Sequence, residues 1–264
     1  MAGFLGDVAS ILMTPFDFAV SAALLAWHEI FALALDGSSG WAWALAIVGM
    51  TVTIRVLMMP LYLRQMHVRR EMRQLDPQIR ALQETYGHDP DLLMKEQMKL
   101  LRAAGIKPFL SFLPLVLLGV LLLALFRIID ASSKYAPADG SFRRGFVTEA
   151  EALSLSQAKI LDARIADSFL GPSHAATEVL AVALTVVMCL THVIAQRQEA
   201  AQIPPDAALP GPTEQKQQFL LYALLVVLVA FGLVLPVGAL IFWATSKVWT
   251  VGQQRMLRDY PGSS

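Results

Sequence analysis

Arg55 is the residue whose type and setting most strongly indicate chemistry. It is the only charge in the apolar run from Trp41 to Leu63, and it is the first lysine or arginine in the chain. An arginine near the middle of a bilayer costs about 2.5–3.5 kcal/mol on translocon scales, and it cannot shed its proton to avoid that cost. Intramembrane ionisable groups usually mark function, so we expect Arg55 to face a wet interior cavity. The alternative is a side chain that extends from a helix end to the lipid headgroups.

Other motifs with known chemistry are missing from the sequence. His28-Glu29 has no second histidine four residues later, as a zinc motif requires, and no Walker-type glycine-rich loop occurs. Cys189 is the single cysteine, which excludes an internal disulfide and a cysteine-based metal cluster. We therefore expect no enzyme activity, no catalytic residue, no metal and no cofactor. Basic charge alone does not establish a nucleic-acid site.

The composition indicates a membrane protein with several spans. The chain has 264 residues, of which 56% are hydrophobic, and its mean hydropathy is +0.54. The run from Trp41 to Leu63 is long enough to cross a hydrocarbon core of about 30 Å. These values favour a polytopic membrane protein over a soluble domain.

Local charge predicts the orientation of the chain. Residues 1–54 contain four acidic residues and no lysine or arginine, whereas residues 64–107 contain nine basic and six acidic residues. The positive-inside rule therefore places the N-terminal side outside and segment 64–107 in the cytoplasm. Residues 131–173 have five basic and five acidic residues, and this balance fits an external loop.

The last apolar stretch, Phe219–Trp243, is uncharged but is interrupted by Gly232, Pro236 and Gly238. One long span would leave the tail arginines outside, and two short spans would return them to the cytoplasm. Two spans agree better with the charge rule. The sequence therefore predicts an all-α fold with five transmembrane helices, the N-terminus outside and the C-terminus inside. The expected segments are an external segment 1–40, spans 41–63, 108–130, 174–196, 217–235 and 236–254, a cytoplasmic segment 64–107, an external loop 131–173, a cytoplasmic loop 197–216 and a cytoplasmic tail 255–264.

The cytoplasmic segment 64–107 is expected to form an antiparallel helical hairpin. Apolar residues recur there at the spacing of helix–helix seams. Asp89-Pro90-Asp91 predicts the start of the second helix, and Ala104-Gly105 predicts its end. The two seams are Leu75, Ile79, Leu82 and Tyr86 in the first helix and Met94, Met98 and Leu101 in the second.

Residues 15–35 form another apolar stretch, and it carries a polar stripe. Asp17, Ser21 and His28 fall on one helical face. Such a stripe suits an amphipathic helix that lies in the interface plane. A full span is the alternative, because Asp36–Gly40 is external in both cases.

Three pieces of the chain form a pattern in which both the order and the spacing of the residues are distinctive. The pieces are Trp43 to Leu61 with Thr51, Thr53, Arg55 and Pro60; the hairpin from Leu75-Asp76-Pro77 through Gly105-Ile106-Lys107-Pro108 to Leu113-Pro114; and Leu235-Pro236-Val237-Gly238 with Phe242-Trp243, Ser246, Trp249 and Gln253-Gln254. Together they cover roughly residues 41–130 and 175–258, and they resemble the YidC/Oxa1/Alb3 membrane-protein insertases.

The resemblance implies an insertase of the bacterial plasma membrane, with nascent membrane proteins and the lipid bilayer as partners. Arg55 would capture a client's polar or acidic tail in a hydrophilic groove. Gln196 and Trp243 are further candidates for the groove lining, and an interfacial aromatic anchor is the alternative for Trp243. The ribosome and the Sec translocon are candidate partners, and the protein is expected to act as a monomer. Glu178, Thr191 and His192 are expected to be interfacial anchors of the third span.

Some residues depart from the family pattern. Leu118-Gly119-Val120 stands where Gln and Pro often follow the second-span proline, and Lys247 stands where Asn is common. These departures suggest a divergent paralogue, and the absence of asparagine suggests a GC-rich, actinobacterial genome. Two competing hypotheses remain. The first is a small transporter or channel, but such proteins usually contain an internal repeat, and this sequence shows none. The second is a structural or scramblase-type membrane subunit.

Overall fold

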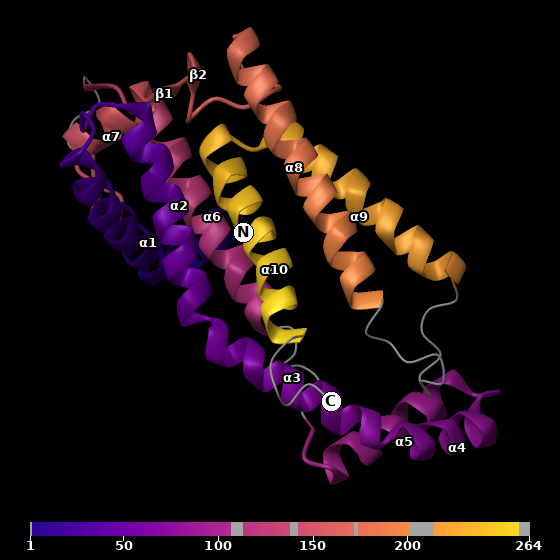
Figure 1. The fold of residues 1–264 in the computed structure, drawn as a ribbon. Coiled ribbons are helices and arrows are strands. Elements are labelled where there is room, and N and C mark those ends of the chain that lie inside the picture. The colour runs from indigo at the N-terminus through magenta and orange to yellow at the C-terminus, as the bar shows by residue number, and fades with distance from the viewer. Residues whose placement is uncertain (1, 107–112, 138–141, 172–173, 201–213, 259–264) are drawn as a thin grey trace.

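The computed structural model describes residues 2–106, 113–137, 142–171, 174–200 and 214–258, and Figure 1 shows its fold. The described residues form ten helices and one two-stranded antiparallel sheet. The helices are α1 (Ala2–Ala32), α2 (Gly40–Leu57), α3 (Met59–Gln74), α4 (Asp76–Tyr86), α5 (Pro90–Ala103), α6 (Leu113–Lys134), α7 (Glu149–Gln157), α8 (Ala175–Ala200), α9 (Glu214–Val234) and α10 (Val237–Arg258). The strands are β1 (Lys159–Ile160) and β2 (Ala163–Arg164).

Four helices are long and apolar enough to cross a membrane, within the described ranges. They are Ser10–Ala32 in α1, all of α2, all of α6, and Ala175–Gln198 in α8. A shorter apolar helix, Leu221–Val234, belongs to α9. The all-helical membrane class is therefore confirmed, and most of the expected linker 197–216 lies outside the described residues.

The helix that carries Arg55 ends earlier than its apolar run. Ser39 caps its N-terminus, with the hydroxyl accepting from the Trp41 N–H at 3.2 Å, and α2 ends at Leu57. Pro60 explains the break, because it has no N–H to bond the carbonyl four residues earlier and its ring crowds that carbonyl. Expected span 41–63 is therefore two helical pieces, and α3 continues to Gln74.

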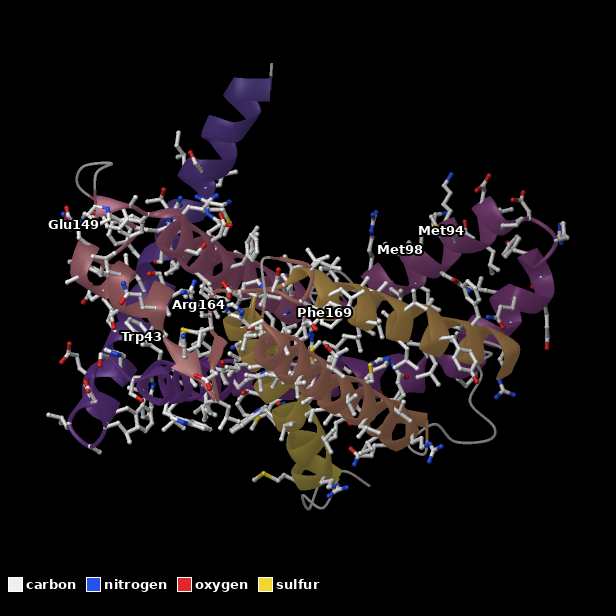
Figure 2. The ribbon with its side chains drawn as sticks, turned by 90° about the horizontal axis from the view of Figure 1, so that it is seen from above. Trp43, Met94, Met98, Glu149, Arg164 and Phe169 are labelled. Atoms are coloured by element: carbon white, nitrogen blue, oxygen red, sulfur yellow. The ribbon has the colours of Figure 1, made fainter. Side chains whose placement is uncertain are left out.

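The expected hairpin is present as α4 and α5, which pack against each other. Asp89 caps α5, its carboxylate accepting from the N–H groups of Asp91 and Leu92, both at 3.1 Å. Ile79 and Leu101 are buried, as the seam pattern predicts. The assignment of Met94 to the seam was wrong, because its side chain is 68% exposed and lies on the outer face of α5 in Figure 2.

The last apolar stretch folds as two helices, as predicted. Leu235 and Pro236 separate α9 from α10, and Pro236 has no N–H with which to continue a helix. Figure 1 shows α10 between α2 and α6 on one side and α8 on the other, in agreement with its contacts to all three. Gly232 lets α9 approach α8, because a Cβ there would overlap Thr185.

The polar stripe of α1 faces the protein, which corrects the expected amphipathic arrangement. Asp17, Ser21 and His28 are all buried, while Ile11 and Leu12 on α1 are largely exposed. The stripe faces inward because its polar side chains contact other residues of the same chain. Asp17 and Ser21 bond residues of the expected loop 131–173, and the His28 ring stacks on Trp43 with 3.8 Å between centroids.

The expected loop 131–173 contains three regular elements that the charge pattern did not reveal. Helix α7 begins with a reciprocal cap, in which Thr148 N–H donates to the Glu151 carboxylate at 2.6 Å. Strands β1 and β2 form a short hairpin, and its two turn residues, Leu161 and Asp162, both have positive φ.

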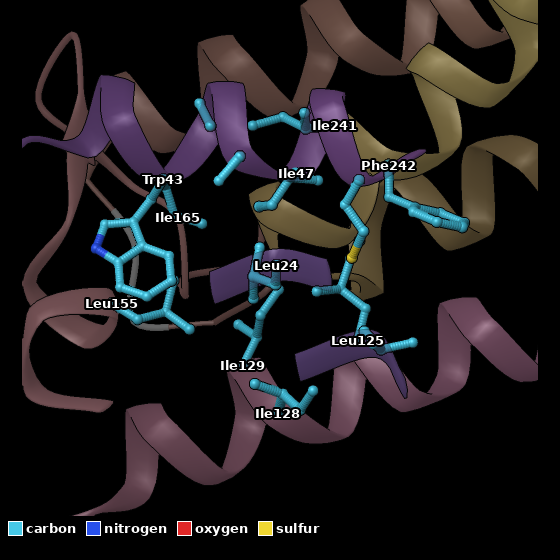
Figure 3. Packing of buried hydrophobic residues seen from close by; sticks show 14 of the residues in the cluster. Leu24, Trp43, Ile47, Leu125, Ile128, Ile129, Leu155, Ile165, Ile241 and Phe242 are labelled. Atoms are coloured by element: carbon cyan, nitrogen blue, oxygen red, sulfur yellow. The ribbon is translucent and has the colours of Figure 1, made fainter. Parts of the chain in front are cut away.

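The larger apolar cluster joins α1, α2, α6, α7 and α10 (Figure 3). Trp43 is fully buried in it, and its indole N–H donates to the Ser154 hydroxyl at 3.0 Å. A second cluster lies between α8, α9 and α10. Both clusters include residues of α10, so this helix connects the two parts of the bundle.

Candidate substrate-binding site around Arg55

Arg55 lies in the last turn of α2 and is only 4% exposed. Its Nε donates to the Ser246 hydroxyl at 2.8 Å, and its Nη2 donates to the Ser246 carbonyl at 2.9 Å. Its Nη1 donates to the Tyr62 hydroxyl at 2.9 Å, with the guanidinium carbon 5.8 Å from the centre of that ring. Residues from three helices, α2, α3 and α10, therefore meet at one cation.

The positive charge of Arg55 has no compensating carboxylate among the described residues. Its three acceptors are a serine hydroxyl, a backbone carbonyl and a tyrosine hydroxyl, all of them neutral. These bonds orient the guanidinium without neutralising it. An uncompensated cation among apolar helices attracts anions strongly, because little water screens it there.

Two further nitrogen side chains are linked to this cation electrostatically, Lys247 directly and His192 through Lys247. Lys247 follows Ser246 on α10, is half-buried, and interacts electrostatically with Arg55. His192 on α8 is 5% exposed and interacts electrostatically with Lys247. The interpretation of His192 as an interfacial anchor was wrong, because the structure buries it against α10.

Additional buried polar groups lie toward the C-terminal ends of α8 and α10. Gln253 is buried, and its amide oxygen accepts from the Trp249 indole N–H at 3.0 Å. Among the described residues of these two helix ends, three of the buried side-chain atoms without a hydrogen-bond partner are His192 Nε2, Gln198 Oε1 and Gln254 Oε1. Buried polar atoms are nearly always paired with protein or water. This region is therefore suited to hold water or a polar ligand.

The other two predicted site residues do not contact Arg55. Gln196 is half-buried on α8, one helical turn beyond His192. Trp243 packs edge-to-face on Phe231 of α9, with 4.9 Å between centroids, as part of the second apolar cluster. Their roles as groove-lining residues stay predictions.

Sequence reasoning missed the residues that hold Arg55. Tyr62 is seven residues after Arg55, which in an unbroken helix is two turns and the same face, so spacing was a usable signal even though α2 ends at Leu57. Ser246 is 191 residues away, and only its place in the family motif pointed to it. No group of three or more potential metal ligands occurs within the described ranges.

A second charged cluster joins α1 to α6 and to the segment after α6. The Asp17 carboxylate accepts from Arg127 Nη2 at 3.4 Å and from Arg144 Nη1 at 3.2 Å. The Ser21 hydroxyl accepts from the Phe146 N–H at 2.9 Å. Asp17 is buried and both arginines are partly exposed, so this cluster holds α1 in place.

The loop between α1 and α2 has its own local structure. Asp36 Oδ1 accepts from the Ser38 N–H at 3.0 Å and from the Ser38 hydroxyl at 2.9 Å. These two bonds, the backbone one first, hold the pKa of Asp36 below its usual value. The loop is therefore a structured turn that presents Ser39 as the cap of α2.

Comparison with known proteins adds independent evidence. The family model described as "60Kd inner membrane protein" matches residues 34–262. A membrane protein insertase YidC of Streptomyces avermitilis is 28% identical over 97% of this chain. Those of Mycolicibacterium paratuberculosis and Tropheryma whipplei (strain Twist) are 26% and 27% identical over 90% and 94% of it.

The chain spans 60% of the length of the Streptomyces protein, 72% of the Mycolicibacterium protein and 84% of the Tropheryma protein. The family match covers most of the chain, including every helix from α2 to α10. The chain therefore belongs to the 60Kd inner membrane protein family, which is the YidC/Oxa1 family.

Proposed function

We propose that this protein inserts transmembrane segments of newly made proteins into the lipid bilayer. The observation that carries the proposal is the buried, uncompensated charge of Arg55, which Ser246 and Tyr62 hold inside a bundle of apolar helices. Family membership and relatives named membrane protein insertase support the same activity.

In the proposed mechanism, Arg55 attracts the polar or acidic tail of a client. Neutral acceptors position the guanidinium without occupying its charge, so an incoming carboxylate gains a charge-assisted hydrogen bond. The client's apolar segment meanwhile enters the lipid beside the bundle. A segment of about 20 apolar residues gains roughly 0.3–0.6 kcal/mol per Leu-like residue, which can offset the transfer of a short polar tail without ATP.

The proposed topology has five spans, formed by α2, α6, α8, α9 and α10. The N-terminal side and the segment with α7, β1 and β2 lie outside, and the α4–α5 hairpin and the C-terminal tail lie in the cytoplasm. The charge bias of residues 64–107 against residues 1–54 supports this orientation. The plasma membrane of a bacterium is the proposed location, consistent with the actinobacterial relatives.

Helix α1 is proposed to lie along the outer interface, although part of it is apolar enough to span. Asp17 in the middle of α1 contacts Arg144, and Gly40, the first residue of α2 after the loop that follows α1, lies against the Lys159 backbone. Both contacts are to the segment proposed to be external. A spanning helix would separate Asp17 from Ala32 by about 22 Å of depth, which these shared contacts oppose.

The proposed partners are nascent membrane proteins and lipid. The ribosome and the Sec translocon are further proposed partners, with the hairpin of α4 and α5 as the docking element on the cytoplasmic side. None of these proposed partners requires the protein to form an oligomer, and we propose that the monomer is active.

Reconstitution tests the function directly. The purified protein is placed in liposomes, a single-span reporter is synthesised in vitro beside them, and protease protection measures insertion. We expect insertion above the level of empty liposomes without ATP added after synthesis. Equal protection in both preparations would refute the proposal.

A further inference from the structure

Arg55 has donor capacity left over. A guanidinium carries five N–H donors, and the structure engages one on Nε, one on Nη1 and one on Nη2. One N–H on each terminal nitrogen therefore has no acceptor among the residues that the structure describes. Two N–H groups on the two terminal nitrogens can bind a carboxylate, the geometry in which arginine binds anions best.

Lys247 provides a second cation beside this one. Within the residues that the structure describes, its ammonium forms no hydrogen bond and no ion pair, and it interacts electrostatically with Arg55. Two uncompensated cations repel each other, so the site is most stable with negative charge between them. One carboxylate can compensate only one of the two charges.

His192 provides a second observation at this site, a buried polar atom. Its side chain is 5% exposed, and its Nε2 atom is buried without a hydrogen-bond partner. It lies on α8, which packs on α10, and it interacts electrostatically with Lys247. A polar atom buried in this way calls for a polar partner.

From this geometry we propose that the site binds two carboxylates of one acidic segment at once, the first at Arg55 and the second between Lys247 and His192. This inference rests on the proposed function and names its preferred substrates: clients whose translocated tail carries a pair of acidic residues. A single arginine would favour one acidic residue and would not distinguish a pair.

Tyr62 is the partner of Arg55 that a carboxylate can replace. Its hydroxyl is a neutral acceptor, it is half-buried, and it lies on α3 beyond the helix break at Met58. A carboxylate carries a negative charge and can accept two parallel N–H bonds from a guanidinium, whereas the tyrosine hydroxyl is neutral and accepts one. When a carboxylate takes the place of the Tyr62 hydroxyl, the guanidinium is uncovered on that side and keeps its two bonds to Ser246.

The spacing of the two acids follows from chain geometry. In an extended segment, residues i and i+2 point to the same side and lie roughly 7 Å apart. Tails containing Asp-Gly-Asp, Asp-Gly-Asn or Asn-Gly-Asn therefore provide probes with two, one or no carboxylates at constant length.

The experiment measures binding of these three fluorescent tails, each followed by the same apolar segment, to the detergent-solubilised full chain. Fluorescence anisotropy at low salt gives the three dissociation constants. The variants are Lys247→Gln and, as a matched control, Lys159→Gln, whose side chain is exposed on β1. Melting curves verify that each variant is folded.

We expect the wild type to bind the two-carboxylate tail about tenfold more tightly than the one-carboxylate tail, the effect of one charge-assisted hydrogen bond. Lys247→Gln should reduce this ratio to about one, and Lys159→Gln should keep it near ten. A wild-type ratio near one, or a ratio that survives in Lys247→Gln, overturns the inference. A tenfold ratio without insertion in liposomes refutes the proposed function and leaves the binding inference standing.

Discussion

Replacing Asp17 with asparagine should loosen α1 from the bundle. Asp17 is the shared acceptor of Arg127 and Arg144, and its side chain is 7% exposed. Asparagine keeps the shape but removes the charge, so two partly buried arginines then face each other uncompensated. Breaking a fully buried pair costs about 3–5 kcal/mol. The arginines are 26% and 32% exposed, so solvent screening reduces the expected loss to about 1–3 kcal/mol.

The assay is thermal unfolding in detergent. At about 2–4 °C per kcal/mol for chains of 150–250 residues, Asp17→Asn should melt roughly 2–12 °C below the wild type. Asp130→Asn is the matched control, because Asp130 pairs with the exposed Lys134 and should shift the melting point by about 2 °C or less. Equal melting points for both variants would refute the role of Asp17. Adding Arg144→Gln to Asp17→Asn should recover part of the loss, since it removes one stranded charge.

The remaining predictions concern packing and topology. Gly49→Ala should lower the melting point, because its new Cβ would lie 2.5 Å from the Trp27 ring and overpacking costs about 1–3 kcal/mol. Gly119→Ala, where a Cβ meets nothing within 4 Å, should raise the melting point slightly, because alanine has the higher helix propensity. Shifts of the melting point in the same direction for both variants would contradict this packing. A cysteine at Lys95 in a Cys189→Ser background should react with a membrane-impermeant maleimide only after the cells are opened. Reaction in intact cells would invert the proposed topology.

Much of the helical architecture could be predicted from the sequence, because strong local signals fix it. Proline and glycine predicted the break between α9 and α10, and Asp89-Pro90 predicted the start of α5. The hairpin between α4 and α5 followed from apolar periodicity. These features depend on residues close in sequence, where steric and capping rules apply directly.

The orientation of α1 could not be predicted because it depends on distant partners. A polar stripe on a helix can face water or can face polar groups of the protein, and the stripe itself does not distinguish the two. The partner that decides the orientation here, Arg144, lies 127 residues after Asp17. The elements of the expected loop 131–173 were missed for a different reason. Leu161-Asp162 is an unusual pair for a tight hairpin turn. The cap of α7 was detectable, since Thr148 and Glu151 have the spacing of a capping box.

The site itself was predictable only at its centre. Arg55 stood out as a lone charge in an apolar run, whereas its partner Ser246 and its neighbours Lys247 and His192 come from helices far along the chain. Lys247 was visible as a departure from the family pattern, but its position beside Arg55 required the packing of α10 on α2.

The most direct test of the proposed function measures the need for charge at Arg55. Arg55→Ala, Arg55→Lys and the wild type are reconstituted in liposomes with paired reporters that differ only in an acidic or a neutral tail. We expect Arg55→Lys to keep most activity, because an ammonium supplies the same charge. Arg55→Ala should insert the acidic-tail reporter poorly and the neutral-tail reporter nearly normally, with a melting point close to the wild type, since the lost bonds to Ser246 and Tyr62 are offset by removal of a buried charge. Equal loss for both reporters together with a lowered melting point in both variants would show that Arg55 is a structural residue, and would contradict capture of the tail by its charge.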